Sequence, residues 1–254
     1  MTVATGRVRL CGVCIDALTM PQVVHRVSES LRTGGRLSIA IVNVAKLVNM
    51  RRDPRLRASV ESGDLVLADG APVVWLSRWT GQPLPERVAG VDLMFELFKL
   101  ADERRLRVYL LGAKADTLNR VVEIAQRDYP NMVVSGFRDG YFSDEQEEGV
   151  ALAIRDARPD ILLVAMSSPK KEVFMKRWED VMGARICHGV GGSFDVMAGL
   201  TRRAPRWMQR CGLEWLFRVL QEPRRMWKRY LVTNTVFMIL AARELLHGPR
   251  LNKE

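Results

Sequence analysis

Between residues 37 and 190 the chain alternates short apolar runs with amphipathic segments, and this rhythm constrains the fold more than any other feature. The apolar runs span residues 38–42, 65–68, 108–111, 132–137, 161–165 and 184–190. Between them, segments such as residues 116–127 carry apolar side chains on one helical face. Strands that alternate with helices form a mostly parallel sheet. We therefore predict an α/β fold, with a Rossmann-like, mostly parallel sheet and helices on both of its faces.

The chain changes character after residue 200. Residues 201–210 are basic and contain the aromatic residue Trp207. A short helix is predicted over residues 212–220, and a last helix from Pro223 to about Leu246. Residues 201–254 contain 12 Lys and Arg against 4 Asp and Glu, and so hold +8 of the chain's net charge of +10. We predict a body of residues 1–200 and a helical basic appendage of residues 201–254. Such a tail indicates an anionic partner: phosphate, diphosphate, acidic lipid headgroups or nucleic acid.

The last predicted helix carries an apolar stripe. Its members recur at helical spacing and are Trp227, Tyr230, Leu231, Met238, Ala241 and Leu245. The uncharged stretch of residues 230–242 is too short to cross a bilayer. The stripe therefore lies in a membrane interface, packs against the body, or is covered by a second subunit, and the sequence leaves these interpretations open. Since the first residues do not resemble a secretory signal, we expect a cytoplasmic protein.

Asp69 is the strongest candidate for a catalytic side chain. It follows the apolar run of residues 65–68, and a helix is predicted from Ala71-Pro72. That order places the carboxylate at the carboxyl end of a strand, where open α/β sheets bind their ligands. An ionised Asp there is suited to act as a general base. The alternative interpretation is that Asp69 only caps the following helix.

Two glycine turns follow other predicted strands. One contains Gly191 and Gly192, and the other is Gly112-Ala113. Turns of this kind bring backbone N–H groups and a helix N-terminus to a phosphate, so the pair suits a nucleotide diphosphate. Phe194 occupies the position at which the dinucleotide fingerprint requires a small residue. A nicotinamide-dependent oxidoreductase therefore remains only an alternative, beside a non-enzymatic module that binds nucleic acid or membranes.

Several motifs together resemble the bacterial WecG/TagA/CpsF-type glycosyltransferases, from about residue 8 to residue 235. They are Asp69-Gly70, Pro85-Glu-Arg-Val-Ala-Gly90, Pro169-Lys-Lys-Glu172, Gly189-Val-Gly-Gly-Ser-Phe-Asp195, Arg203-Ala-Pro-Arg-Trp207 and Gly212-Leu-Glu-Trp-Leu-Phe-Arg218. The resemblance implies an inverting, metal-independent transfer of a hexose or N-acetylhexosamine from a UDP-sugar, without a cofactor. The implied acceptor is a sugar on undecaprenyl diphosphate at the inner face of the plasma membrane. The implied product is exopolysaccharide, capsule or a teichoic-acid type polymer, and no nucleic acid takes part.

The resemblance also assigns roles to residues. It makes Asp69 the catalytic base, places Asn43 and Arg87 in the active site, and makes Asp195 a uracil contact. Arg218 and Arg225 match the part of the appendage that closes over the diphosphate, and Gly112, Ala113, Gly191 and Gly192 fall in the UDP-binding turns. The chain contains no D-x-D pair that would hold a metal-bound nucleotide. Fixed basic side chains must then neutralise the leaving diphosphate.

Two positions depart from the family's pattern. Ile41-Val42-Asn43 stands where the family often has T-P-N, so any contribution of the Thr hydroxyl is absent. Lys171 stands where the family commonly has Gln, and it replaces an amide with a full positive charge. If this side chain contacts the donor, the charge implies either tighter binding of the diphosphate or a donor other than UDP-N-acetylmannosamine, such as UDP-glucose.

Overall fold

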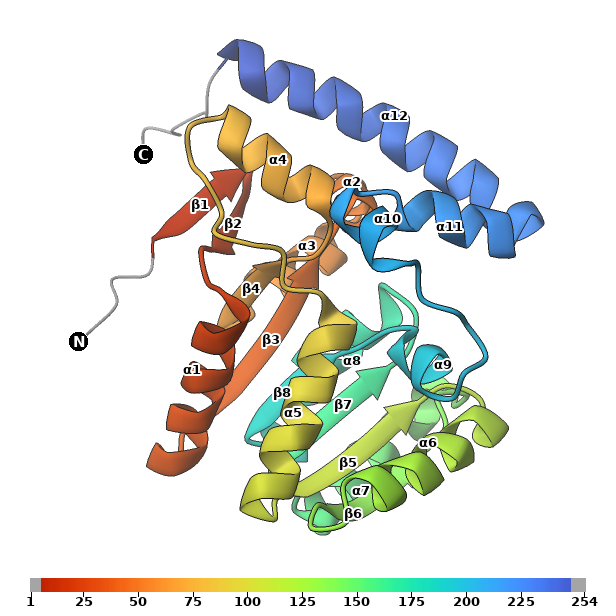
Figure 1. The fold of residues 1–254 in the computed structure, drawn as a ribbon. Helices are drawn as coiled ribbons and strands as arrows, with labels where there is room; N and C mark the ends of the chain where they lie inside the picture. Colours follow the sequence, from red (N-terminus) through yellow and green to blue (C-terminus); the bar gives the residue numbers. More distant parts are fainter. Residues whose placement is uncertain (1–5, 248–254) are drawn as a thin grey trace.

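The computed structural model describes residues 6–247, apart from the side chains of Arg225, Arg229 and His247. Its centre is a six-stranded sheet in the order β4-β3-β8-β7-β5-β6 (Figure 1). The strands are β3 (Leu37–Val42), β4 (Leu65–Ala68), β5 (Arg107–Gly112), β6 (Val133–Arg138), β7 (Ile161–Ala165) and β8 (Ile186–Gly189). Every neighbouring pair is parallel. The predicted α/β fold is therefore confirmed, and each predicted run overlaps a strand.

Helices cover both faces of this sheet, which explains why its inner strands are apolar at nearly every position. One face carries α1 (Met20–Thr33), α5 (Gly90–Arg104), α6 (Ala115–Asp128) and α9 (Ser193–Met197). On the other face, the helices over β3 and β4 are α2 (Val44–Met50), α3 (Pro54–Glu61) and α4 (Ala71–Trp79). Those over β5, β7 and β8 are α7 (Glu147–Ala157), which follows the 3-10 turn η1 (Asp144–Gln146), and α8 (Lys170–Met182).

A separate antiparallel hairpin precedes the sheet. It consists of β1 (Arg7–Leu10) and β2 (Val13–Asp16), joined at Cys11 and Gly12, which both have positive φ, as a tight type I′ turn requires. The buried carboxylate of Asp16 accepts a hydrogen bond of 2.8 Å from the backbone N–H of Val66 in β4. This contact fixes the hairpin against the edge strand of the main sheet.

The basic appendage folds as three helices, α10 (Arg206–Arg210), α11 (Glu214–Gln221) and α12 (Pro223–His247). In Figure 1, α12 lies across the top of the molecule beside α4, and it packs against α2. Phe237, Leu240 and Ala241 of α12 belong to the same buried cluster as Val42 and Val66 of the sheet. The appendage therefore completes part of the core. Within residues 6–247, no helix is long and apolar enough to cross a membrane.

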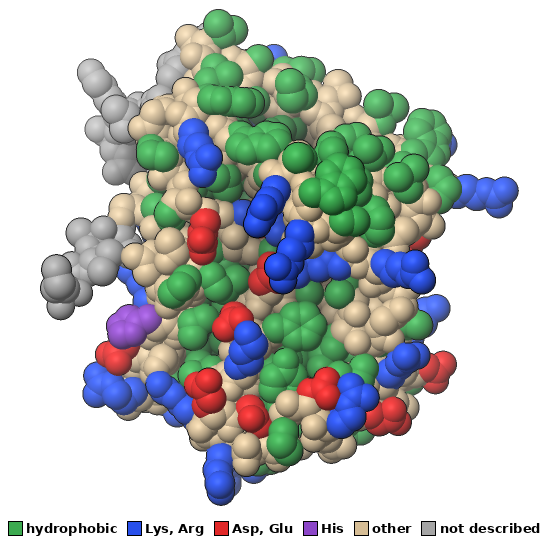
Figure 2. Space-filling model, in the orientation of Figure 1, with side chains coloured by type: hydrophobic (Ala, Val, Ile, Leu, Met, Phe, Trp, Pro, Cys, Tyr) green, Lys and Arg blue, Asp and Glu red, His purple; other side chains and the backbone are tan. Residues whose placement is uncertain are grey.

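The buried face of α12 is not the predicted stripe. The helix buries Met226, Thr233, Phe237, Leu240 and Ala241. Only Ala241 belongs to both sets, because α12 is apolar on two sides and the body covers one of them. Figure 2 shows apolar side chains gathered in the upper part of the molecule, where α11 and α12 lie. We call the following residues the exposed apolar surface: Trp79, Leu220, Trp227, Leu231, Met238, Leu245 and Leu246.

Candidate active site

A cavity of about 640 Å³ lies where the carboxyl ends of β3 and β4 meet the appendage. This volume is within the usual range for sites that bind small molecules, about 300–1,000 Å³. Its polar lining includes Asn43, Asp69, Arg203, Glu214 and Arg218. The rest of the lining is largely apolar and comes mainly from α4 and α12, with further residues from α2, α5, α9 and α11. The cavity therefore combines the strand ends of the sheet with the helices of the appendage.

Asp69 lines this cavity directly after β4. Its backbone N–H donates to the Val42 carbonyl of β3 at 2.8 Å, so the two strand ends are held side by side. The N-cap of α4 is Gly70, with φ of +119°, a conformation that favours glycine. Asp69 thus precedes the cap position, and the alternative interpretation as a helix cap does not describe this geometry.

The surroundings of Asp69 change its acidity. Burial raises the pKa of its carboxyl to about 6, against the opposing effect of the Arg87 guanidinium. Glu214 and Asp92 raise this pKa further, whereas Arg218 lowers it. A carboxylate with a pKa near 6 is ionised at neutral pH, and still binds a proton more tightly than an ordinary Asp. These are the properties of a general base.

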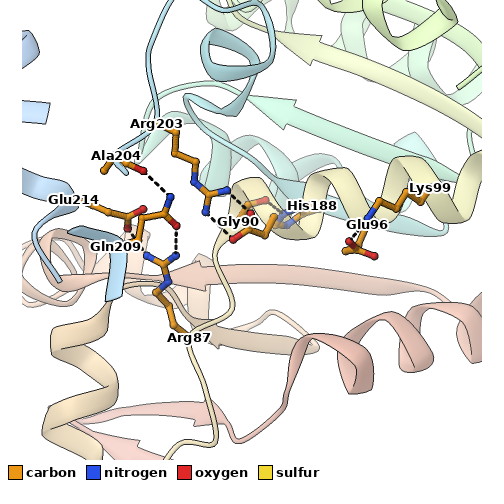
Figure 3. A network of polar contacts seen from close by, with 10 residues as sticks. Arg87, Gly90, Glu96, Lys99, His188, Arg203, Ala204, Gln209 and Glu214 are labelled. Atoms are coloured by element: carbon orange, nitrogen blue, oxygen red, sulfur yellow. Dashed lines mark hydrogen bonds and ion pairs between the residues drawn. The ribbon is translucent and has the colours of Figure 1, made fainter. Parts of the chain in front are cut away.

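Two ion pairs join the body to the appendage beside Asp69. Arg87 pairs with Glu214 at the start of α11. Figure 3 shows Arg87 also reaching Gln209, at 3.2 Å, while the amide nitrogen of Gln209 donates to the Ala204 carbonyl at 2.8 Å. A second pair joins Arg203 to Asp92 of α5, with one of its two contacts at 2.7 Å. The appendage is therefore held to the cavity by charge.

The other active-site candidates are placed as follows. Asn43 lines the cavity and caps α2, because its side-chain oxygen accepts the Lys46 N–H at 3.0 Å. Its amide nitrogen is the side-chain group that remains for a ligand. Arg218 lines the cavity from α11. Arg225 is the third residue of α12, and its side chain lies outside the described part of the structure.

The glycine turns lie at the same edge of the sheet but outside the lining of this cavity. A Cβ on Gly112 would come within 2.4 Å of the Ala165 carbonyl oxygen, so glycine is required there. The Ala113 N–H donates to that carbonyl at 2.9 Å and is thus already engaged. Gly191 and Gly192 follow β8, which pairs with β3, so their turn lies about 5 Å from the β3 end in the strand-to-strand direction.

Asp195 belongs to the first turn of α9, the short helix that follows the Gly191-Gly192 turn. Its carboxylate is not part of the cavity lining, but the next residue, Val196, is. The α9 helix therefore connects the turn after β8 to the cavity that contains Asp69.

Lys171, which the resemblance makes a candidate substrate contact, lies outside the lining of this cavity. It is buried at the start of α8, and its ammonium pairs with Glu172 rather than lining the cavity. Lys46 of α2 pairs with the same carboxylate at 2.8 Å. Burial alone would raise the pKa of Glu172, but the two ammonium groups overcome it and hold this pKa at about 2.

Sequence reasoning did not single out several side chains at this site. They are Asp92, Gln209, Glu214 and the aromatic residues Trp75, Trp79 and Trp215. One signal was present, since Glu214 is one of only four acidic residues in the basic tail. In the described residues, no three or more His, Cys, Asp or Glu side chains are grouped so that they would hold a metal ion.

Comparison with known proteins connects this geometry to characterised enzymes. Residues 8–251 match the glycosyl transferase WecG/TagA/CpsF family. The chain is 38% identical over 180 residues to an N-acetylglucosaminyldiphosphoundecaprenol N-acetyl-beta-D-mannosaminyltransferase from Bacillus spizizenii, a match that covers 71% of this chain and 69% of that enzyme. It is 40% identical over 172 residues to the enzyme of the same name from Bacillus subtilis, covering 68% of this chain and 66% of the relative.

Proposed function

Because the chain belongs to the WecG/TagA/CpsF glycosyl transferase family, we propose that it moves a hexose or N-acetylhexosamine from a UDP-sugar to a sugar linked to undecaprenyl diphosphate. The names of the two relatives support this type of acceptor, and specify N-acetylmannosamine as the sugar that those enzymes transfer. The observation that carries the proposal is Asp69, a carboxylate with a raised pKa that lines a cavity among arginines. The product would enter a cell-surface polysaccharide of the exopolysaccharide, capsule or teichoic-acid type.

In this reaction Asp69 accepts the proton of the acceptor hydroxyl. The hydroxyl oxygen then forms a bond to the anomeric carbon of the donor sugar, and the bond from that carbon to the diphosphate oxygen breaks, so that UDP leaves with the electron pair. Attack from the face opposite UDP inverts the configuration, and an α-linked donor yields a β-linked product. A positioned general base contributes about 10²–10⁴-fold to such a step.

The leaving diphosphate needs positive charge, because no metal is required in the proposed mechanism. Arg218 lines the cavity, and Arg87 lies beside it with Glu214 as its partner. Guanidinium groups bind phosphate oxygens in a bidentate manner. We assign the UDP to the edge between the β3 end and the turns after β8 and β5. Three strand spacings, about 14 Å, separate β3 from β5 there. In this arrangement Asp195 contacts the uracil, and Arg225 closes over the diphosphate.

The exposed apolar surface supports a peripheral attachment to the membrane that carries the acceptor. Aromatic and aliphatic side chains on α11 and α12 would enter the interface, and the basic residues of the appendage would meet anionic headgroups. Co-flotation with vesicles that contain phosphatidylglycerol tests this attachment. We expect binding that weakens as salt is raised, and Trp227→Ser combined with Leu231→Ser should reduce it. Unchanged flotation of that double variant would contradict it.

A panel of UDP-sugars, incubated with undecaprenyl-diphosphate N-acetylglucosamine, tests the transfer itself. We expect one UDP-sugar to yield a β-linked disaccharide lipid and free UDP. Release of UDP without a lipid-linked product, or no reaction with any donor, would contradict the proposal. Thermal shifts with UDP and NAD⁺ separate it from the oxidoreductase alternative. Phe194 is fully buried at the position that a dinucleotide-binding turn leaves small, so we expect stabilisation by UDP alone.

A further inference from the structure

The cavity has two ends of different chemistry. One end holds the side chains of Asn43, Asp69 and Arg218, beside the ion pairs of the appendage. The lining of the rest is largely apolar: Trp75, Leu76, Trp79, Phe237, Met238, Ala241, Ala242 and Leu245. A sugar or a nucleotide needs hydrogen-bond partners along its whole length, and this second end offers few of them. Its ligand must be largely hydrocarbon.

The apolar part is a groove that follows two helices, and we call it the α4–α12 groove. On α4 the lining residues recur over one helical face from Ala71 to Trp79, about 12 Å. On α12 they recur from Tyr230 to Leu245, about 22 Å. Figure 1 shows these helices side by side at the top of the molecule. The groove therefore begins at the strand ends, beside Asp69, and extends away from them between the two helices.

The far end of the groove opens on the exposed apolar surface. Trp79 and Leu245 at this end are 66% and 47% exposed, and Met238, midway along the α12 lining, is 67% exposed. They belong at once to the groove and to the surface that we assign to the membrane. A hydrocarbon chain would thus pass from the membrane into the groove without crossing a polar boundary.

We propose that the α4–α12 groove binds the first isoprene units of the acceptor lipid. The acceptor is a sugar, a diphosphate and a polyprenyl chain in linear order, and the cavity offers a carboxylate and arginines at one end and hydrocarbon at the other. Binding the chain there directs the sugar toward Asp69, and the acceptor's own diphosphate then lies between the sugar and the groove. The inference rests on the proposed function, and it adds a subsite that selects lipid-linked acceptors over free sugars.

The first experiment compares two acceptors in the full-length protein. Both carry N-acetylglucosamine diphosphate, one on undecaprenol and the other on a short alkyl chain. Ala242 is exposed and lines the groove, so Ala242→Trp adds a large side chain to the groove from its open side. We expect the ratio of kcat/KM for the long-chain acceptor to that for the short-chain acceptor to fall at least tenfold. A ratio equal to that of the unaltered protein would overturn the proposal.

Thr235→Trp is the matched control, since Thr235 is an exposed residue of the same helix that does not line the cavity. The acceptor ratio should stay as it is in the unaltered protein. If the acceptor ratio fell equally in both variants, α12 would act through its contact with the membrane surface alone. This result would also overturn the proposed role of the groove. Dissociation of a dimer by Ala242→Trp, with the ratio unchanged, would instead assign the groove to a second copy of the chain.

The second experiment does not depend on transfer. A polyprenyl diphosphate with a diazirine near its first isoprene unit, and without a sugar, is photolysed with the full-length protein in detergent. We expect labelled peptides from α4 and α12, and competition by undecaprenyl phosphate. Labelling confined to other elements would overturn the proposal. Labelling of α4 and α12 in a protein that uses no UDP-sugar would support the groove while removing the proposed function.

Discussion

Two charged clusters on neighbouring parts of the fold treat their carboxylates in opposite ways. Around Asp69 the pKa rises to about 6, whereas around Glu172 it falls to about 2. Burial acts to raise the pKa of both carboxyl groups, so it does not explain the difference. The difference lies in the cations. Lys46 and Lys171 both contact Glu172, whereas Arg87 beside Asp69 is already paired with Glu214.

The comparison shows how the same protein keeps one carboxylate, that of Glu172, ionised and leaves another, that of Asp69, ready to accept a proton. Two further acidic residues lie near Asp69. Glu214 pairs with Arg87, and Asp92 pairs with Arg203, so each arginine is partly neutralised. The arginines then remain near the cavity without suppressing the basicity of Asp69. A titratable group is a candidate for catalysis when it lies in a cavity and when burial and an identified charged neighbour shift its pKa. The Glu172 cluster meets the first condition but does not lie in the cavity.

Replacing Asp69, the proposed base, should have the largest effect. Asp69→Asn removes the proton acceptor while keeping the size of the side chain, so kcat should fall by about 10³-fold or more. The UDP dissociation constant, measured by calorimetry, should change less than about twofold. Near-normal turnover of this variant would show that another group is the base.

The same substitution also reports on the pKa without any substrate. Because the folded-state pKa of Asp69 lies above its ordinary value, the ionised carboxylate opposes folding at pH values above about 6. Asp69→Asn should therefore raise Tm at pH 7.5, and the gain should disappear as the pH falls through 6 toward 4. An equal gain at both ends of this range would argue against the raised pKa.

Breaking the other cluster should affect stability rather than chemistry. Glu172→Gln leaves the ammonium groups of Lys46 and Lys171 buried without their carboxylate, and we expect a loss of about 3–5 kcal/mol in the free energy of unfolding. Glu179→Gln breaks the exposed pair with Lys176 and is the control, with an expected loss below about 1 kcal/mol. Urea denaturation measures both. Equal losses would mean that the buried pairs contribute no more than surface ones.

A smaller change concerns the pH dependence of the reaction. Glu214 raises the pKa of Asp69, so Glu214→Gln should lower it and move the acid limb of kcat/KM to lower pH. Arg218 has the opposite effect on Asp69, and Arg218→Gln should move the limb to higher pH. Profiles recorded from pH 4.5 to 8.5 distinguish the two. If the acid limbs of the two variants shifted in the same direction, this description of the cluster would be contradicted.

Lys171→Gln should have the smallest effect. It introduces the residue common in the family, and Glu172 keeps its pair with Lys46. Since the ammonium of Lys171 is buried and paired with Glu172, we expect KM for the donor to change less than about twofold. A tenfold increase would show that Lys171 reaches the donor after all, and would restore the interpretation drawn from the motif.

The sequence predicted the sheet well because its signal is local. Short apolar runs between amphipathic helices mark parallel strands, and the run at residues 65–68 coincides with β4. The position of Asp69 at a strand end followed from the same pattern. The pairing of Arg87 with Glu214 could not be predicted in this way. The two residues are 127 positions apart, and the periodicity of a sequence carries no information about such a contact.

Side-chain direction was the other limit. The residues of α12 recur at helical spacing on two sides, and hydrophobicity alone does not say which side the body covers. A motif likewise shows which residue stands at position 171 but not where its side chain points. The direction of the Lys171 side chain depends on its pair with Glu172, which Lys46 shares. From the sequence, the Ala113 N–H was a candidate hydrogen-bond donor to a phosphate. In the fold, β5 lies beside β7, and this N–H donates to the Ala165 carbonyl instead.

The placement of α12 has a consequence for synthesis. Phe237, Leu240 and Ala241 complete the buried cluster around α2, a helix that leaves the ribosome some 170 residues before α12 begins. Until α12 emerges, the side of α2 that it covers stays exposed, and exposed apolar surface of this kind promotes aggregation. The nascent chain must therefore wait for its last helix or be shielded by a chaperone. A newly made molecule consequently becomes fully folded only when the helix that we assign to the lipid has arrived.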